Sequence, residues 1–193
     1  MNETVDVVVT YIIDYLQLMG PFLGILLVLL ESILPVLPLG VFITLNFASF
    51  GNLFGFFLSW SATCIGCYVS FLIFRSCFQK QFSKLLSKKK SKQLKEMMKK
   101  IDNITFANLV VLVALPFTPA FLINIASGLS KISKKKFLIS ILIGKISIVF
   151  FWGFIGKSLL ESITDIKTIF IVSIIMVIFY FLSKVVGKKL KIE

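Results

Sequence analysis

The sequence contains no histidine, a single arginine and three cysteines. The absence of histidine excludes a Ser-His-Asp triad, a Cys-His pair and any histidine-ligated metal site. Two of the cysteines, Cys64 and Cys67, form a C-x-x-C pair, but a zinc site needs about four nitrogen or sulfur ligands, so we interpret them as packing residues. An acid pair within the apolar segments and a serine-centred glycine elbow are also missing. We therefore expect no enzymatic activity, no metal and no cofactor.

Acidic residues are scarce as well, with 9 Asp and Glu against 21 Lys and Arg and a net charge of +12. Hydrophobic residues make up 58% of the 193 positions and the mean hydropathy is +0.98, whereas soluble domains are about 45–50% apolar. A helix crosses a bilayer with about 20 apolar residues. The charge pattern indicates an anionic membrane surface as the partner and not nucleic acid. The chain is therefore predicted to be an all-α integral membrane protein, with uncharged stretches at 15–30, 32–74, 103–130 and 168–183.

The positions of the lysines predict the topology, because short loops rich in Lys and Arg stay in the cytoplasm. A basic segment, 75–102, precedes the apolar stretch 103–130, and a basic group at 131–136 follows it. Both ends of this stretch should therefore lie on the cytoplasmic side. Two crossings would need about 40 residues, and Pro116 and Pro119 interrupt the stretch near its middle, where a helix has to break. We predict a re-entrant hairpin over 103–130.

We expect the first crossing to span residues 51–74 and to begin on the outside. The same reasoning applies to the segment that precedes it. Segment 31–50 is too short for two crossings and is broken by Pro35 and Pro38, so we predict another re-entrant hairpin, entering from the outside. The chain is then a single multi-pass domain of the plasma membrane, 1–193. Its predicted parts are the N-terminal helix or helices 1–30, the hairpin 31–50, the crossing 51–74, the basic amphipathic cytoplasmic segment 75–102, the hairpin 103–130, the crossings 137–156 and 168–183, and the basic cytoplasmic tail 184–193.

The two hairpins resemble each other. Each has a Pro-x-x-Pro break, each carries an asparagine soon after it, and each leads into a glycine-bearing crossing. This pattern indicates an inverted repeat with two opposed hairpins, an architecture typical of transporters. The N-terminal segment leaves two alternatives: one tilted helix kinked at Gly20-Pro21, or an in-plane helix to Met19 followed by the first limb of the hairpin.

The candidate site residues lie at the breaks and near them. Broken backbone at membrane depth is tolerated where it is buried in protein or lines a wet cavity, because each unpaired group costs several kcal/mol in lipid. Placing the charged side chain of Glu31 or Lys145 near the bilayer centre costs about 2.5–3.5 kcal/mol or more, unless the side chain is paired or hydrated. We therefore expect both side chains to face the interior of the protein, where they could meet. The alternative places Glu31 at the interface and lets Lys145 snorkel. The predicted substrate pathway consists of Glu31, Pro35, Pro38, Asn46, Pro116, Pro119, Asn124 and Lys145.

The two asparagines and the basic segment each allow two interpretations. Asn46 and Asn124 could bind the opened backbone or a polar headgroup, and a structural role is expected for at least one of them. In segment 75–102, apolar residues recur at helical spacing with lysines between them, which is typical of a helix lying in the interface. The basic residues serve as a topology signal, and each would attract anionic lipid by about 1 kcal/mol near the surface. The predicted lipid-surface residues are Lys88, Lys89, Lys90 and Lys92.

These motifs resemble a known family. The segments E-S-I-L-P-V-L-P at 31–38, F-G-N-L-F-G at 50–55 and L-P-F-T-P-A-F-L-I-N-I-A-S-G-L at 115–129, with Gly66 and Arg75 between them, resemble the VTT-domain superfamily of DedA-like and SNARE-associated Golgi proteins. The resemblance implies two opposed re-entrant hairpins and a scramblase or flippase activity toward phospholipid or polyprenyl-phosphate headgroups.

The sequence also departs from the family pattern. DedA proteins often carry a second acid shortly after the first proline pair and arginines around the second, where this chain has Gly40 and Val113 or Ala120. The chain is therefore similar to the less charged branch of the superfamily, and a proton-coupled, phosphate-clamping mechanism is not implied.

Two functions remain in competition. The first is a transporter that scrambles or flips lipid or lipid-linked headgroups through a polar breach between the hairpins. The second is a non-transporting membrane organiser or assembly factor that binds partners or anionic lipid through its basic segment. Both make membrane lipids, anionic headgroups above all, the expected partners. The sequence sets no oligomeric state, and a homo-oligomer is compatible with it.

Overall fold

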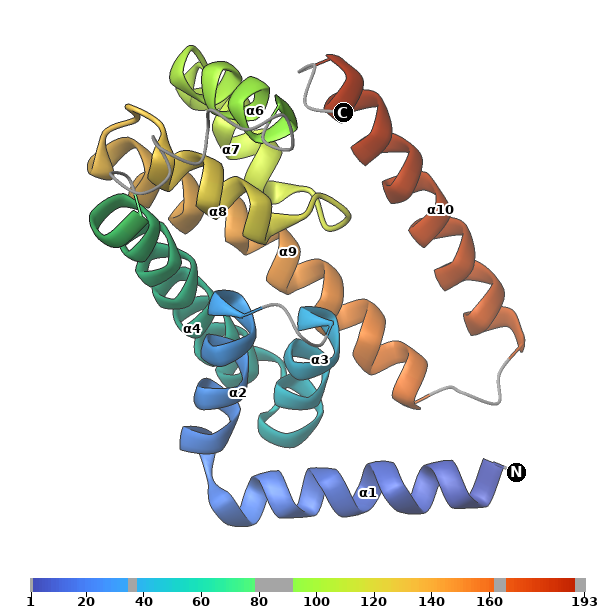
Figure 1. The fold of residues 1–193 in the computed structure, drawn as a ribbon. Coiled ribbons are helices and arrows are strands. Elements are labelled where there is room, and N and C mark those ends of the chain that lie inside the picture. The colour runs from blue at the N-terminus through green and yellow to red at the C-terminus, as the bar shows by residue number, and fades with distance from the viewer. Residues whose placement is uncertain (1, 35–37, 79–91, 162–165, 190–193) are drawn as a thin grey trace.

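The computed structural model of the chain describes residues 2–34, 38–78, 92–161 and 166–189, and its regular structure in these ranges is entirely helical (Figure 1). Its elements are α1 (Asn2–Met19), α2 (Pro21–Ile33), α3 (Leu39–Phe50), α4 (Asn52–Ile73), the π-helical turn η1 (Phe74–Phe78), α6 (Lys92–Asp102), α7 (Phe106–Ala114), α8 (Ala120–Leu129), α9 (Lys134–Glu161) and α10 (Ile166–Lys189).

Three described helices are long and apolar enough to cross a membrane: Asn52–Cys77, Lys134–Leu160 and Ile166–Gly187. They coincide with the predicted crossings 51–74, 137–156 and 168–183. In lipid, the backbone of an apolar stretch of about 20 residues can form its hydrogen bonds only within its own helix. The chain is thus a helical membrane protein with three such helices, or four if the bent pair of α1 and α2 forms one span.

The N-terminal segment is sharply bent. The chain bends by 109° between the helices Val7–Met19 and Pro21–Ile33. The bend lies at Gly20, whose φ of 73° is in the left-handed region that favours glycine, and Pro21 begins the next helix, a position where its missing N–H costs nothing. The segment therefore consists of two helices with a sharp bend between them, which is compatible with one broken span and with a helix to Met19 followed by a separate limb.

Each proline break separates two short helices. The first unit consists of α2 and α3 and begins at Pro21, earlier than the predicted 31–50, so Glu31 lies near the end of a limb and does not open it. The reason is that no residue between Pro21 and Ile33 breaks a helix. The second unit consists of α7 and α8, within the predicted 103–130. Both units have the helix–break–helix form of a hairpin, and their entry into a bilayer from opposite faces stays a prediction.

The two halves, α2–α3–α4 and α7–α8–α9, repeat the same contacts. A Cβ added at Gly66 of α4 would lie 2.9 Å from the Leu29 carbonyl oxygen of α2, and one added at Gly144 of α9 would lie 2.9 Å from the Val110 carbonyl oxygen of α7. In each half, therefore, the first limb packs on its own long helix through one glycine. Both breaks also read L-P-x-x-P, at 34–38 and 115–119.

The long helices of the two halves pack against each other in opposite directions (Figure 1). The Phe71 and Phe137 rings are stacked at 4.3 Å, whereas Phe56 contacts Phe150 at the other end of the pair, at 4.6 Å. The second limb of each hairpin crosses to the other half, so that α3 packs on α9 and α8 packs on α4. This exchange brings the two breaks to the same level of the molecule.

The part of the basic segment that forms α6 packs against the protein itself. In α6, Ile101 is fully buried and Met98 packs against the core cluster that includes Leu109 and Phe137. The apolar side of this helix is thus partly used within the molecule, although the sequence pattern predicted a helix lying in the interface. Figure 1 shows α6, the end of α4, the beginning of α9 and the end of α10 toward one end of the molecule, and the predicted cytoplasmic location of this end stays a prediction.

Candidate functional site

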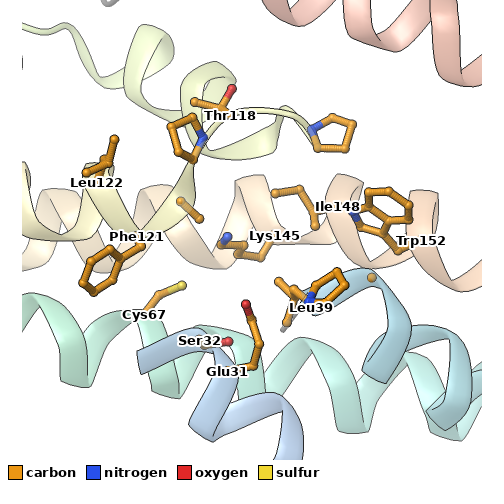
Figure 2. Close-up of a pocket in the computed structure, with 15 residues that line it drawn as sticks. Glu31, Ser32, Leu39, Cys67, Thr118, Phe121, Leu122, Lys145, Ile148 and Trp152 are labelled. Carbon is orange, nitrogen blue, oxygen red and sulfur yellow. The ribbon is translucent and has the colours of Figure 1, made fainter. Parts of the chain in front are cut away.

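A cavity of about 390 Å³ lies between the two breaks (Figure 2). We call it the inter-hairpin cavity. Both hairpins and both long helices of the repeat contribute to its wall, since the exchange of the second limbs brings their midpoints together. Its lining consists of Glu31, Ser32, Pro38, Leu39, Gly40, Cys67, Pro116, Thr118, Pro119, Ala120, Phe121, Leu122, Lys145, Ile148 and Trp152.

Lys145 is the most unusual residue of this lining. Its side chain is 1% exposed, and its Nζ atom has no hydrogen-bond partner among the described residues. Figure 2 shows it within the cavity, on α9. Placing an ammonium group away from water costs several kcal/mol unless another charge or a polar ligand compensates it. Lys145 lies far from either end of α9, so its ammonium group cannot reach the membrane surface. A compensating group therefore has to lie in the cavity.

Glu31 is the acidic residue of this lining. Its half-buried carboxylate reaches the same cavity from α2, and Figure 2 shows it on the side of the cavity facing Lys145. Both residues, which the sequence predicted to face the interior, line this cavity, and their part in a substrate pathway stays a prediction.

Apart from these two groups, the cavity is mainly apolar. Its wall contains prolines from both breaks, the indole of Trp152 and aliphatic side chains, with hydroxyl groups at Ser32 and Thr118. A water molecule takes about 30 Å³ in the liquid, so the space is large enough for several waters or for a small polar group. One cation and one carboxylate in such a wall can bind a polar group that would be unstable in hydrocarbon.

The structure brings five of the eight predicted pathway residues together. Pro38, Pro116 and Pro119 line the cavity with Glu31 and Lys145. Pro35 lies outside the described residues. The predicted lipid-surface residues Lys88, Lys89 and Lys90 also lie outside the described residues, and Lys92 is described only as the first residue of α6.

The two asparagines are buried but do not line the cavity. Asn46 donates to the Gly24 carbonyl at 3.3 Å and to Ser59 Oγ at 3.1 Å, so it joins α3 to α2 and α4. Asn124 is 2% exposed, and its amide nitrogen has no partner among the described residues. Asn46 thus has the structural role that was one of its two interpretations.

Sequence reasoning missed two contributors. Cys67 lines the cavity; it directly follows Gly66 as Lys145 directly follows Gly144, and this correspondence was the available signal. Arg75 donates to the carbonyl groups at the end of α8, and its guanidinium lies 4.7 Å from the ring centre of Phe71. The signal for Arg75 was that it is the only arginine of the chain. Its acceptors are the backbone oxygens of Ser127, Gly128, Ser130 and Ile132.

Comparison with known proteins shows which proteins this chain resembles. The VTT domain model matches residues 34–158, which include both breaks, α4 and most of α9. The uncharacterized membrane protein YhjE of Bacillus subtilis (strain 168) is 35% identical over 173 residues, which cover 89% of this chain and 80% of that protein. No solved structure matches the chain. Within the described residues no group of three or more His, Cys, Asp or Glu side chains could hold a metal ion. The match from the first proline break to most of α9, over more than half of the chain, shows that the chain belongs to the VTT-domain family.

Proposed function

We propose that this protein moves lipid or lipid-linked headgroups across the bilayer through the inter-hairpin cavity. The observation that carries the proposal is the Lys145 ammonium, which is 1% exposed and has no hydrogen-bond partner among the described residues. An ammonium with three free donors suits the anionic oxygens of a phosphate group.

The physical basis is the cost of moving a charged headgroup through hydrocarbon. That cost is prohibitive for an isolated ion, and a wall that presents a cation and a carboxylate lowers it. The acyl chains are already stable in hydrocarbon, so they remain in lipid while the headgroup passes between the two breaks. In this proposal the hairpins enter from opposite faces, the C-terminus and segment 75–102 are cytoplasmic, and the membrane is the plasma membrane.

The test is transport by the purified protein in vesicles. A phospholipid with a fluorophore on one acyl chain keeps its native headgroup, and a membrane-impermeant quencher added outside removes the fluorescence of the outer leaflet. With active protein, the inner-leaflet lipid also becomes accessible and is quenched. The assay is repeated with anionic and with zwitterionic headgroups.

Lys145→Met is the decisive variant, because methionine fills a similar volume without charge. We expect the rate to fall about tenfold or more, equivalent to about 1.4 kcal/mol or more of lost stabilisation. Lys134→Met, on the exposed first turn of the same helix, is the matched control and should retain the wild-type rate. No increase in accessible lipid over empty vesicles, across all headgroups, would show that the proposal is wrong.

A further inference from the structure

The last helix, α10, is attached to the rest of the protein differently from the other long helices. Of its apolar stretch 11% is buried within the protein, against 50% for Asn52–Cys77 and 44% for Lys134–Leu160. Figure 1 shows α10 alongside α9 at the periphery of the molecule. In α10 the buried residues are Val172, Ser183 and Gly187.

The contacts of α10 include two aromatic pairs beside the inter-hairpin cavity. Tyr180 meets Phe117 edge to face, with ring centres 6.0 Å apart, and Phe179 meets Phe151 at 4.7 Å. Phe117 belongs to the second proline break and also contacts Trp152 at 6.0 Å. The neighbours of Phe117 in the chain, Pro116 and Thr118, line the cavity, and so does Trp152. The wall of the cavity on this side is therefore bounded by rings that α10 contacts from outside.

Moving α10 away from this wall breaks fewer packing contacts than separating the helices of the repeat from one another. In a bilayer there is no hydrophobic drive between helices, so separation loses only packing and hydrogen bonds. The helices of the repeat are in close contact at glycines such as Gly66 and Gly144. A Cβ atom added at either glycine would lie less than 3 Å from an atom of the neighbouring helix. The described contacts of α10 beside the cavity are between aromatic side chains, which can part and re-form without changes in the backbone.

We propose that α10 acts as a lateral strap on the inter-hairpin cavity. When Tyr180 and Phe179 lie against Phe117 and Phe151, the strap holds the second break in place and closes this side of the cavity. When α10 moves aside, Phe117 is released and the break between α7 and α8 can open toward the lipid. The gating role rests on the proposed function, whereas the movement of α10 can be measured without it.

The first experiment restrains the strap in vesicles. In a protein with Cys77→Ala, the pair Phe117→Cys and Tyr180→Cys is joined by a reducible bis-thiosulfonate linker, and lipid transport is measured before linking, after it and after reduction. The same reagent applied to Cys77→Ala alone corrects for reaction at the cavity residue Cys67. We expect linking to slow transport at least about fivefold and reduction to restore it.

The matched control joins two helices of the repeat. Phe56 of α4 and Phe150 of α9 have ring centres 4.6 Å apart and involve no residue of α10. Linking cysteines at these positions should change the rate less than about twofold. The proposal is overturned if the linked Phe117–Tyr180 pair transports at the unlinked rate, or if the control pair slows transport as much.

The second experiment measures the movement directly. Spin labels on Ile178 of α10 and Phe57 of α4, both exposed, report their separation in bilayers. We expect two separations, with Phe117→Ala increasing the share of the longer one and Phe54→Ala, an exposed ring on α4, leaving it unchanged. One narrow separation unaffected by Phe117→Ala would overturn the strap. If Cys77→Ala protein transports no lipid in the first experiment, the proposed function fails while these separations still decide whether α10 moves.

Discussion

The two halves of the repeat share one framework and differ in what they add to the cavity. In both, the first limb packs on its own long helix through a glycine, Gly66 or Gly144. Glu31 comes three positions before the Leu34 that opens its break, and Leu112 holds the same place before Leu115. The residue after the packing glycine is Cys67 in one half and Lys145 in the other. Each half therefore contributes one charge, the first a carboxylate from a limb and the second an ammonium from a long helix.

The halves also differ in how their second limbs are held. In the first half, α3 is fixed along its length: Thr44 donates to the Trp152 carbonyl at 3.0 Å, and Asn46 bonds to α2 and α4. In the second half, α8 is held at its end by Arg75, while the amide nitrogen of Asn124 and the hydroxyl group of Ser127 have no partner among the described residues. The comparison shows that side chains hold the second limb near its middle in one copy of the repeat and at its end in the other.

The largest effect should come from the feature that the halves share. Gly66→Val and Gly144→Val would each place side-chain atoms where the neighbouring helix leaves no space. At Gly66 even a Cβ atom would lie 2.5 Å from Ser32 Cβ, and at Gly144 it would lie 2.4 Å from Val113 Cγ2. We expect each to lower the free energy of unfolding by about 2–3 kcal/mol, as overpacking does. Titration with a denaturing detergent measures it. The exposed Ser158→Val is the control, and a clearly unequal pair of losses would contradict the equivalence of the two halves.

The second effect should be confined to the second half. Arg75→Gln removes charged donors from the carbonyl groups at the end of α8 and should cost about 2 kcal/mol, with Arg75→Lys in between because lysine lacks the planar fork. Hydrogen exchange should rise at the amides of 127–132 and stay unchanged in α3. Lys134→Gln, which leaves these bonds intact, is the control. Equal acceleration in both second limbs would mean that Arg75 stabilises the whole bundle and not one hairpin.

The smallest effect separates the two asparagines. Asn46→Ala removes two bonds and should lower the free energy of unfolding by about 1 kcal/mol, because hydrogen bonds between membrane helices contribute modestly. Asn124→Ala removes an amide nitrogen without a partner among the described residues and should change stability by less than about 0.5 kcal/mol. Both variants are measured in the same titration. A larger loss at Asn124 than at Asn46 would reverse the difference between the second limbs.

Much of the fold could be predicted because it depends on local chemistry. Long apolar stretches predict α4, α9 and α10, and in α9 this holds in spite of Lys145, since only a helix satisfies the backbone of such a segment in lipid. Pro116 and Pro119 predict the break between α7 and α8 for the same local reason. The start of α2 at Pro21 was not predicted, because a Gly-Pro pair fits a kink in one helix as well as the boundary between two.

Within the site, residue type alone predicted the charged pair but not its surroundings. Glu31 and Lys145 stand out in any apolar sequence, because each is too costly to face lipid. Asn46 and Asn124 look alike in sequence, and only the packing of α3 between α2 and α4 gave Asn46 its partners. Cys67 was interpreted as a packing residue, although its place after Gly66 puts it in the wall of the cavity.

By itself, the sequence determined that this chain lives in a membrane, where its backbone breaks, and which two charges need a polar place inside. The tertiary structure decided which helix faces meet, and with them the cavity, the exchanged second limbs and the exposed position of α10. The physical reason is that a soluble helix marks its inward face by being apolar there, whereas a helix in lipid is apolar on every side. Its inward face is chosen by small residues and shape, and these act only when the partner helix is in place.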